Sequence, residues 1–206
     1  MKGLLRYYLW LSARLAIRFN RHDRALELYE KVERLTRTGV NASAPIMAQG
    51  HVWGLKGDRA RAKAEFQRAL VIAPNEAVAH FNVGWVCDQQ GLLDDALAHF
   101  EQAVKINPKF DRAWYGIGII AIRRGNHARA KQAFQEVVRI EPMNKHGWYQ
   151  LGMTHFILGE AGELIGLKQH TMRFNPTIAQ MLDRDTVRLK AQIDFAGAPG
   201  TVSVAM

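Results

Sequence analysis

The chain has 206 residues, of which 48% are hydrophobic, enough for the packed core of one large domain or two small ones. Its 28 lysines and arginines against 19 aspartates and glutamates give a net charge of +9, which suits an anionic partner without naming one. The single cysteine, Cys87, excludes an intramolecular disulfide and a thiolate metal cluster and favours a reducing compartment, so we expect a cytoplasmic protein.

The first nineteen residues combine large apolar and basic side chains in a helical pattern. On a helical projection one face carries Leu4, Leu5, Tyr8, Leu11, Leu15 and Phe19, and the other carries Lys2, Arg6, Arg14, Arg18 and Arg21. Because arginines interrupt the apolar stretch, it does not resemble a cleaved signal peptide. No apolar run in the chain is long enough to predict a transmembrane helix.

Two interpretations of this N-terminal helix stay open. It is either the first helix of the fold, packed against the next one, or a helix that lies on a membrane surface and meets anionic head groups. The packed interpretation is favoured because the helix that follows needs a partner. Under the membrane interpretation, the residues that contact the anionic surface are Lys2, Arg6, Arg14 and Arg18.

Beyond this helix, three ladders of glycine and proline run along the chain at a spacing of 34 residues. They are Gly50, Gly84, Gly118 and Gly152; Gly57, Gly91, Gly125 and Gly159; and Pro74, Pro108, Pro142 and Pro176. The same period holds for Ala62, Ala96 and Ala130 and for Phe66, Phe100 and Phe134. A fixed period of this length indicates a repeat architecture.

Each 34-residue unit is predicted to form two amphipathic helices, because its apolar residues recur at intervals of three and four. In the unit 111–144, Gly125 with Asn126 breaks the chain between the helices, and Pro142 ends the second one. Gly118 lies in the middle of a helix, where glycine costs about 1 kcal/mol relative to alanine. We therefore expect a neighbouring helix to approach the backbone closely at this ladder.

In chain order, the period predicts a repeat domain over 1–178, with repeats at about 6–39, 43–76, 77–110, 111–144 and 145–178. The first repeat is weaker, and Asn20 stands 37 residues before Gly57, so about three residues are inserted near 40–42. In the last repeat Leu164, Lys168 and Thr171 replace the usual Ala, Phe and Ala, which suggests a loose or displaced second helix.

The segment after Pro176 departs from the period. Apolar residues on one helical face predict a capping helix over 179–195; they are Ile178, Met181, Leu182, Leu189 and Ile193. The small, uncharged residues of 196–206 predict a disordered tail.

The repeats resemble the tetratricopeptide repeat family, whose pattern places Trp, Leu, Gly and Tyr in the first helix and Ala, Phe and Pro in and after the second. The residues that match are Trp114, Ile117, Gly118, Ala130, Phe134 and Pro142; Trp148, Leu151, Gly152 and Pro176; Gly50, Trp53, Ala62, Phe66, Ala69 and Pro74; and Val83, Gly84, Ala96, Phe100, Ala103 and Pro108. His80 and Cys87 replace two of the usual aromatic residues.

The resemblance covers roughly residues 6–178 and implies an all-α helix-turn-helix solenoid. It implies about five repeats in a right-handed superhelix, closed by the capping helix. Proteins of this family bind partners on the inner surface formed by the first helices of the repeats. The resemblance therefore implies a non-catalytic scaffold, with the partner itself left unidentified.

By the same resemblance, the second, fifth, ninth and twelfth residues of each first helix line the groove. The candidate partner-binding residues are Trp10, Arg14, Met47, His51, Phe81, Trp85, Asp88, Arg112, Tyr115, Ile119, Tyr149, Met153 and Phe156. This lining is aromatic and apolar, and the family's carboxylate clamp has no full set here beyond Asn82 and Arg112. Alternatively, the capping helix covers some of these side chains, or they pack between repeats.

Signals of catalysis or cofactor binding are weak. The segment GIGIIA at 116–121 matches a dinucleotide fingerprint by letters, but it falls inside a predicted helix instead of following a strand. His80 and Cys87 occupy repeat core positions, and the remaining histidines show no metal-ligand spacing. We expect no enzyme, no cofactor, no metal and no small-molecule substrate.

Two hypotheses of function follow. The favoured one is a protein-interaction scaffold or adaptor whose concave groove takes an apolar segment of another protein. The alternative is an assembly factor held on the inner face of a membrane by its basic amphipathic N-terminal helix. Nucleic-acid binding is not favoured, because the basic residues alternate with acidic ones and form no evident stripe.

Overall fold

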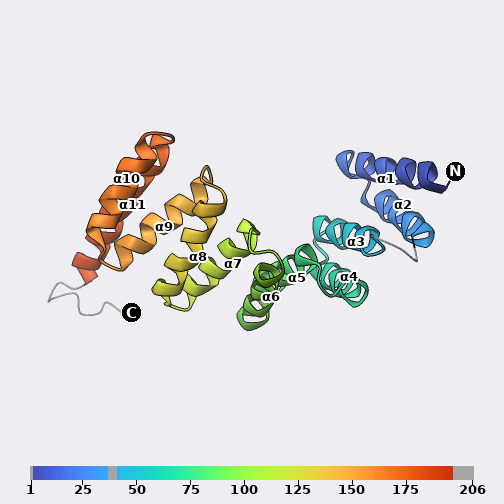
Figure 1. Cartoon of the computed structure of the whole chain (residues 1–206), viewed down its shortest axis with the longest axis horizontal. Coiled ribbons are helices and arrows are strands. Elements are labelled where there is room, and N and C mark those ends of the chain that lie inside the picture. The colour runs from blue at the N-terminus through green and yellow to red at the C-terminus, as the bar shows by residue number, and fades with distance from the viewer. Residues whose placement is uncertain (1, 37–40, 197–206) are drawn as a thin grey trace, which may run out of the picture. The chain divides into compact units, whose positions relative to one another are not determined.

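A computed structural model describes residues 2–36 and 41–196, and within these ranges it contains helices and no strand (Figure 1). The helices are α1 (Lys2–Arg18), α2 (His22–Leu35), α3 (Ala44–Leu55), α4 (Arg59–Ile72), α5 (Ala77–Gln89), α6 (Leu93–Ile106), α7 (Asp111–Arg123), α8 (His127–Ile140), α9 (Lys145–Ile157), α10 (Ala161–Met172) and α11 (Pro176–Ala196). Residues 37–40, which include the start of the insertion predicted near 40–42, and 197–206 of the predicted tail lie outside the described residues, whereas Ala196, the first residue of that tail, ends α11.

Each predicted repeat corresponds to one helix pair, from α1 and α2 to α9 and α10, so the helix-turn-helix prediction is confirmed. Two features differ from the expectation. The capping helix α11 begins at Pro176, earlier than 179, because proline is well suited to the first turn of a helix. The second helix of the last repeat, α10, is a regular helix that buries Leu164, Leu167 and Thr171.

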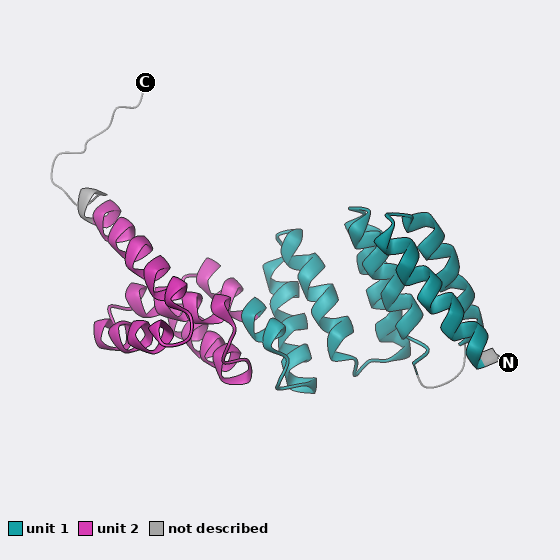
Figure 2. Ribbon diagram, turned by 90° about the horizontal axis from the view of Figure 1, so that it is seen from above, with its two compact units in different colours: residues 1–116 teal, residues 117–206 magenta. Residues whose placement is uncertain are grey.

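The chain divides into two compact units, 1–116 and 117–206 (Figure 2). Unit 1 contains α1 to α6 and the first part of α7. Unit 2 contains the rest of α7 and the helices α8 to α11.

The second glycine ladder marks the turns inside the repeats. Its four members have positive φ angles between 70° and 81°, in the left-handed region that glycine adopts without steric cost. Asn20 has a φ of 56° at the corresponding turn between α1 and α2. Asparagine tolerates this conformation better than most residues, so the first repeat keeps the same turn without glycine.

The first glycine ladder leaves room for the phenylalanines that recur every 34 residues. A Cβ atom on Gly50 would lie 2.6 Å from Phe66, and one on Gly118 would lie 2.6 Å from Phe134. On Gly152 it would instead lie 2.7 Å from Leu182 of α11, because Lys168 stands where the other repeats have phenylalanine. The capping helix thus supplies the core side chain that the last repeat lacks.

The proline ladder supplies hydrogen-bond acceptors between repeats. The Trp114 indole N–H donates to the Pro108 carbonyl at 2.9 Å, and the Trp148 indole donates to Pro142 at 2.7 Å. His80 holds the same position in its repeat and places Nε2 3.1 Å from the Pro74 carbonyl oxygen. His80 therefore takes over the structural contact of the missing tryptophan, and Cys87 is fully buried in the core.

Candidate partner-binding surface

The residues predicted to line the groove are all half-buried or exposed. Unit 1 holds Trp10, Arg14, Met47, His51, Phe81, Trp85, Asp88, Arg112 and Tyr115, and unit 2 holds Ile119, Tyr149, Met153 and Phe156. None of them is fully buried, although Trp10 and Phe81 pack partly against core residues. Their partners and surroundings differ from one repeat to the next.

Around α5 the aromatic residues divide into packed and open ones. The ring of Phe81 lies 5.7 Å from that of Phe100 and 5.1 Å from that of Phe110. The Arg112 guanidinium covers the Phe81 ring at 5.1 Å. Trp85, one turn further along α5, keeps 44% of its surface exposed. Trp85 is therefore the aromatic side chain of this helix with the most surface to offer a partner.

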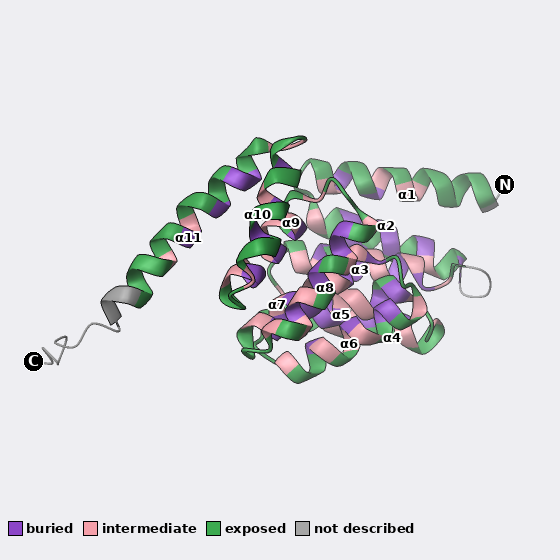
Figure 3. Cartoon of the chain, turned by 60° about the vertical axis from the view of Figure 1, so that its left-hand side comes forward, coloured by how far each residue is buried: buried purple, intermediate pink, exposed green. Residues whose placement is uncertain are grey.

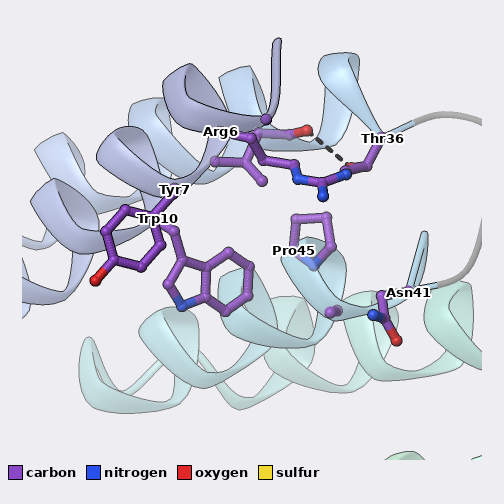
Figure 4. A pocket seen from close by; sticks show the side chains of 9 residues that line it. Arg6, Tyr7, Trp10, Thr36, Asn41 and Pro45 are labelled. Atoms are coloured by element: carbon purple, nitrogen blue, oxygen red, sulfur yellow. Dashed lines mark hydrogen bonds between the residues drawn. The ribbon is translucent and has the colours of Figure 1, made fainter. Parts of the chain in front are cut away.

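Two hollows flank Trp10 at the N-terminal end of unit 1, and we call them together the Trp10 cleft. The first, of about 320 Å³, is lined by Gly3, Arg6, Tyr7, Trp10, Val32, Thr36, Asn41, Ala44 and Pro45. Figure 4 shows the Arg6 guanidinium directed toward Thr36 and Pro45, with the Trp10 ring on the same side of α1. The second hollow, of about 370 Å³, is lined by Trp10, Arg14, Ile17, Tyr29 and His51.

Tyr29 of α2 forms the floor of the second hollow. Its ring meets that of Trp10 edge-on, with centroids 5.1 Å apart, and only 3% of the residue is exposed. Burial raises the pKa of the Tyr29 hydroxyl, and the nearby charge of Arg14 partly opposes this.

The charge of the Trp10 cleft is one-sided. Its lining contains Arg6 and Arg14 and no aspartate or glutamate. A third hollow of unit 1, lined in part by Glu30, Glu33 and Glu65, differs because its groups pair with one another. There Glu33 accepts hydrogen bonds from Gln49 and from Arg68, each at 2.7 Å.

One carboxyl group in that hollow, Glu65, has a shifted pKa. Burial raises the pKa of Glu65 above its usual value, and the neighbouring Arg68 partly opposes this effect. The carboxylates of this hollow are thus neighboured by arginines of the same unit, and Glu33 and Glu65 both pair with Arg68. The Trp10 cleft has no such internal pairing, since Arg6 and Arg14 form no ion pair within the described part of the chain.

In unit 2 the capping helix touches the predicted groove residues. The Tyr149 hydroxyl donates a hydrogen bond to Asp185 of α11 at 2.9 Å. Hydrogen bonds from Arg184 and from Tyr149 lower the pKa of Asp185, and burial together with this contact raises the pKa of Tyr149. Part of the predicted groove is therefore engaged by the chain's own C-terminal helix.

The outer face of α1 is the largest apolar feature at the N-terminus. The residues that share this face are Leu4, Leu5, Tyr8, Leu11, Leu15 and Phe19, and all of them are exposed, Leu4 to 77% and Phe19 to 69% (Figure 3). The helix packs against its neighbours through a different face, which buries Ala13 and Ala16. Leu9, Trp10 and Ile17 are partly buried against the same core, so α1 packs as the favoured interpretation expects, while the large apolar residues of the projected face stay exposed.

The basic residues assigned to an anionic surface lie in different settings. Arg14 lines the second hollow and Arg6 the first, whereas Arg18 is exposed at the end of α1. The side chain of Lys2 lies outside the described part of the chain. The sequence interpretation assigned Arg6 to a membrane surface alone and missed its place in the cleft.

The sequence also missed several lining residues of the cleft that lie outside the first helices. Tyr29, Thr36 and Pro45 belong to α2, its C-terminal end and the start of α3. One signal was present, because the inserted residues near 40–42 break the spacing between the first two repeats at this point. An altered spacing between repeats changes which side chains meet across the junction.

Within the described ranges, no three or more His, Cys, Asp or Glu side chains gather as metal ligands would. None of the described helices combines the length and apolar character needed to cross a membrane.

A family model described as a tetratricopeptide repeat matches residues 56–110, 88–144 and 115–163. Among solved structures, MamA 41-end from Desulfovibrio magneticus RS-1 is 20% identical, with a TM-score of 0.66 over 90% of this chain and 98% of that one. PilF of Pseudomonas aeruginosa is 14% identical, with a TM-score of 0.71 over 96% and 95% of the two chains.

YrrB, described as a TPR protein with an unusual peptide-binding site, is 21% identical, with a TM-score of 0.65 over 85% of this chain and 90% of that one. No curated protein matches the chain by sequence. At these identities the solved structures establish the fold they share with this chain.

Proposed function

Since this chain belongs to the tetratricopeptide repeat family, whose repeats act as non-catalytic platforms for protein binding, we propose that it is a scaffold or adaptor for another protein. Its groove would take an apolar, helical or extended segment of the partner. The observation that supports this most directly is that the aromatic and apolar side chains predicted to line the groove are left unburied, Trp85 above all.

Energetics favour the aromatic residues as anchors. Aromatic side chains in a concave surface offer a large contact area and lose little conformational entropy on binding. Such an anchor contributes about 2 kcal/mol or more, roughly thirtyfold in affinity. Phe81 is already held between Phe100, Phe110 and Arg112, so we assign the larger share to Trp85.

The test compares a groove variant with a core variant. Trp85→Ala combined with Tyr115→Ala should abolish the capture of partner proteins from a native lysate while helical content and melting change little. Phe134→Ala, at a fully buried side chain, should instead lower stability by about 3–5 kcal/mol. If the groove variant melts like the core variant, these aromatic residues are structural and the binding surface lies elsewhere.

The exposed outer face of α1 supports a second candidate, an assembly factor held at a membrane surface. Six large apolar side chains are exposed on one side of this helix, and contiguous apolar surface of this kind marks contact sites for proteins or membranes. No acidic residue occurs before Asp23, so the helix suits a surface of anionic lipids. The arginines of α1 would add affinity over about a Debye length.

Vesicles test this candidate. Binding to vesicles with anionic lipid should exceed binding to neutral vesicles and weaken with salt, and Leu11→Asp with Leu15→Asp should remove it. The matched control, Leu92→Asp, places the charge on an exposed leucine outside α1 and should bind like the wild type. Equal binding to neutral and anionic vesicles, or none to either, would exclude an electrostatic membrane anchor.

A further inference from the structure

We propose that the Trp10 cleft is a selective subsite for an acidic, apolar segment of the partner protein, in which a hydrophobic side chain neighbours carboxylates. This inference rests on the proposed function and names the chemistry of the partner at one end of the groove. The shape and the charge of the cleft support it independently.

The two hollows of the Trp10 cleft are large enough for side chains of a partner protein. The two hollows, of about 320 and 370 Å³, lie on either side of the Trp10 ring. Each far exceeds the roughly 30 Å³ that a water molecule occupies. The aromatic rings of Tyr7 and Trp10 and the ring of Pro45 offer apolar walls, so an apolar side chain of a partner would bury surface there.

The charge selects carboxylates. Arg6 lines the first hollow and Arg14 the second, and neither is neutralised by an acidic side chain within the described part of the chain. Guanidinium groups hydrogen-bond carboxylates in a bidentate geometry, and these charge-assisted bonds are stronger than neutral ones. The acidic hollow of the same unit shows the opposite case, because its arginine Arg68 is already paired with Glu33.

Tyr29 lines the second hollow together with Arg14, and its ring meets that of Trp10 with centroids 5.1 Å apart. It adds an aromatic wall beside the arginine.

Two synthetic peptides provide the test. One is a fluorescein-labelled peptide of alternating leucine and aspartate, and the other has lysine in place of each aspartate. We expect the full-length protein to bind the acidic peptide with at least about tenfold higher affinity than the basic one. Arg6→Gln with Arg14→Gln should weaken the acidic peptide by about tenfold or more.

The matched control is Arg18→Gln with Arg21→Gln, which removes the same charge from exposed arginines outside the cleft. This control should leave most of the affinity.

Four results would overturn the inference: equal binding of both peptides, no binding of either, equal losses in the two arginine pairs, or displacement of the peptide by inorganic phosphate at matched ionic strength. The proposed function has a separate readout. If lysate capture is lost in the Trp85 and Tyr115 variant but survives Arg6→Gln with Arg14→Gln, the scaffold function stands and the acidic subsite does not.

Discussion

Trp10 in unit 1 and Tyr149 in unit 2 hold the same place in their repeats, the fifth residue of repeats 6–39 and 145–178, but their surroundings differ. Trp10 meets Tyr29 edge-on and stands between two hollows. Tyr149 donates a hydrogen bond to Asp185 of the capping helix. The repeat pattern determines where a side chain emerges, while elements outside the pattern determine whether it is left open to a partner.

The same contrast holds for the core. Gly50 in unit 1 accommodates Phe66 of its own repeat, whereas Gly152 in unit 2 accommodates Leu182 of α11. A terminal repeat has no following repeat to cover its apolar face, so a capping element must do so. In unit 2 the capping helix α11 has two roles. Its Leu182 fills the core at Gly152, and its Asp185 accepts a hydrogen bond from the predicted groove residue Tyr149.

The largest effect is expected from Leu182→Ala. Leu182 is fully buried against Gly152, so its truncation should leave a cavity and lower the stability of unit 2 by about 2–5 kcal/mol. Urea unfolding followed by circular dichroism measures the loss. Val187→Ala on the same helix removes a side chain that is 69% exposed and should change stability by less than about 0.5 kcal/mol. Equal effects would show that α11 does not cap the core.

A matched pair of glycines in α3 tests the first ladder with opposite signs. A Cβ on Gly50 would lie 2.6 Å from Phe66, so Gly50→Ala should destabilise by about 1–3 kcal/mol. Gly54 has no heavy atom within 4 Å of its Cβ position, so Gly54→Ala should stabilise by up to about 1 kcal/mol through helix propensity. Thermal melts of both variants measure the difference, and a stabilised Gly50→Ala would contradict the packing role of the ladder.

The sequence predicted the repeats because their signals are local and periodic. The positive φ at Gly57 and the close approach of Phe134 to Gly118 each require glycine at a fixed spacing, so both are visible in the sequence as a periodic glycine. The contact of Leu182 with Gly152 leaves no periodic trace, because α11 lies outside the repeat. Lys168 in place of phenylalanine showed that the last repeat was incomplete, but it did not show what completes it.

The candidate surface was less predictable for a related reason. Its lining residues on the first helices follow from the resemblance, and the structure leaves them unburied. The hollows beside Trp10 depend on the junction between α2 and α3, where the inserted residues change the period. The burial pattern of α1 also escaped projection, because Ala13 and Ala16 pack it together with the partly buried Leu9, Trp10 and Ile17, while the residues of the projected apolar face stay exposed.

The smallest effect concerns the hydrogen bond between Tyr149 and Asp185, which closes the groove side of unit 2. Tyr149→Phe should lower stability at neutral pH by less than about 1 kcal/mol, since the hydroxyl is partly exposed to water. The same change should leave the capping of the core intact, because Leu182 is untouched. Tyr149→Phe therefore removes the contact of α11 with a predicted groove residue and keeps its contact with the core.

The pH dependence of this variant gives its signature. The hydrogen bonds from Arg184 and Tyr149 hold the pKa of Asp185 below its ordinary value of 3.8, so the ionised carboxylate is favoured in the folded state. Its contribution to stability is present above pH 3.8 and is lost as the pH falls through the lowered folded pKa. The stability difference between wild type and Tyr149→Phe should therefore be constant at neutral pH and shrink below pH 3.8.

Urea unfolding at a series of pH values measures that difference, with Tyr7→Phe as the control, because Tyr7 is an exposed tyrosine without such a contact. Asp185→Asn keeps a hydrogen-bond acceptor but cannot ionise in this range, so it should remove the acid dependence at this site. A difference that grows on acidification would mean that the Tyr149 hydroxyl does not favour the Asp185 carboxylate. In that case α11 would contact the groove side of unit 2 without engaging it electrostatically, and Tyr149 would be as available to a partner as Trp10.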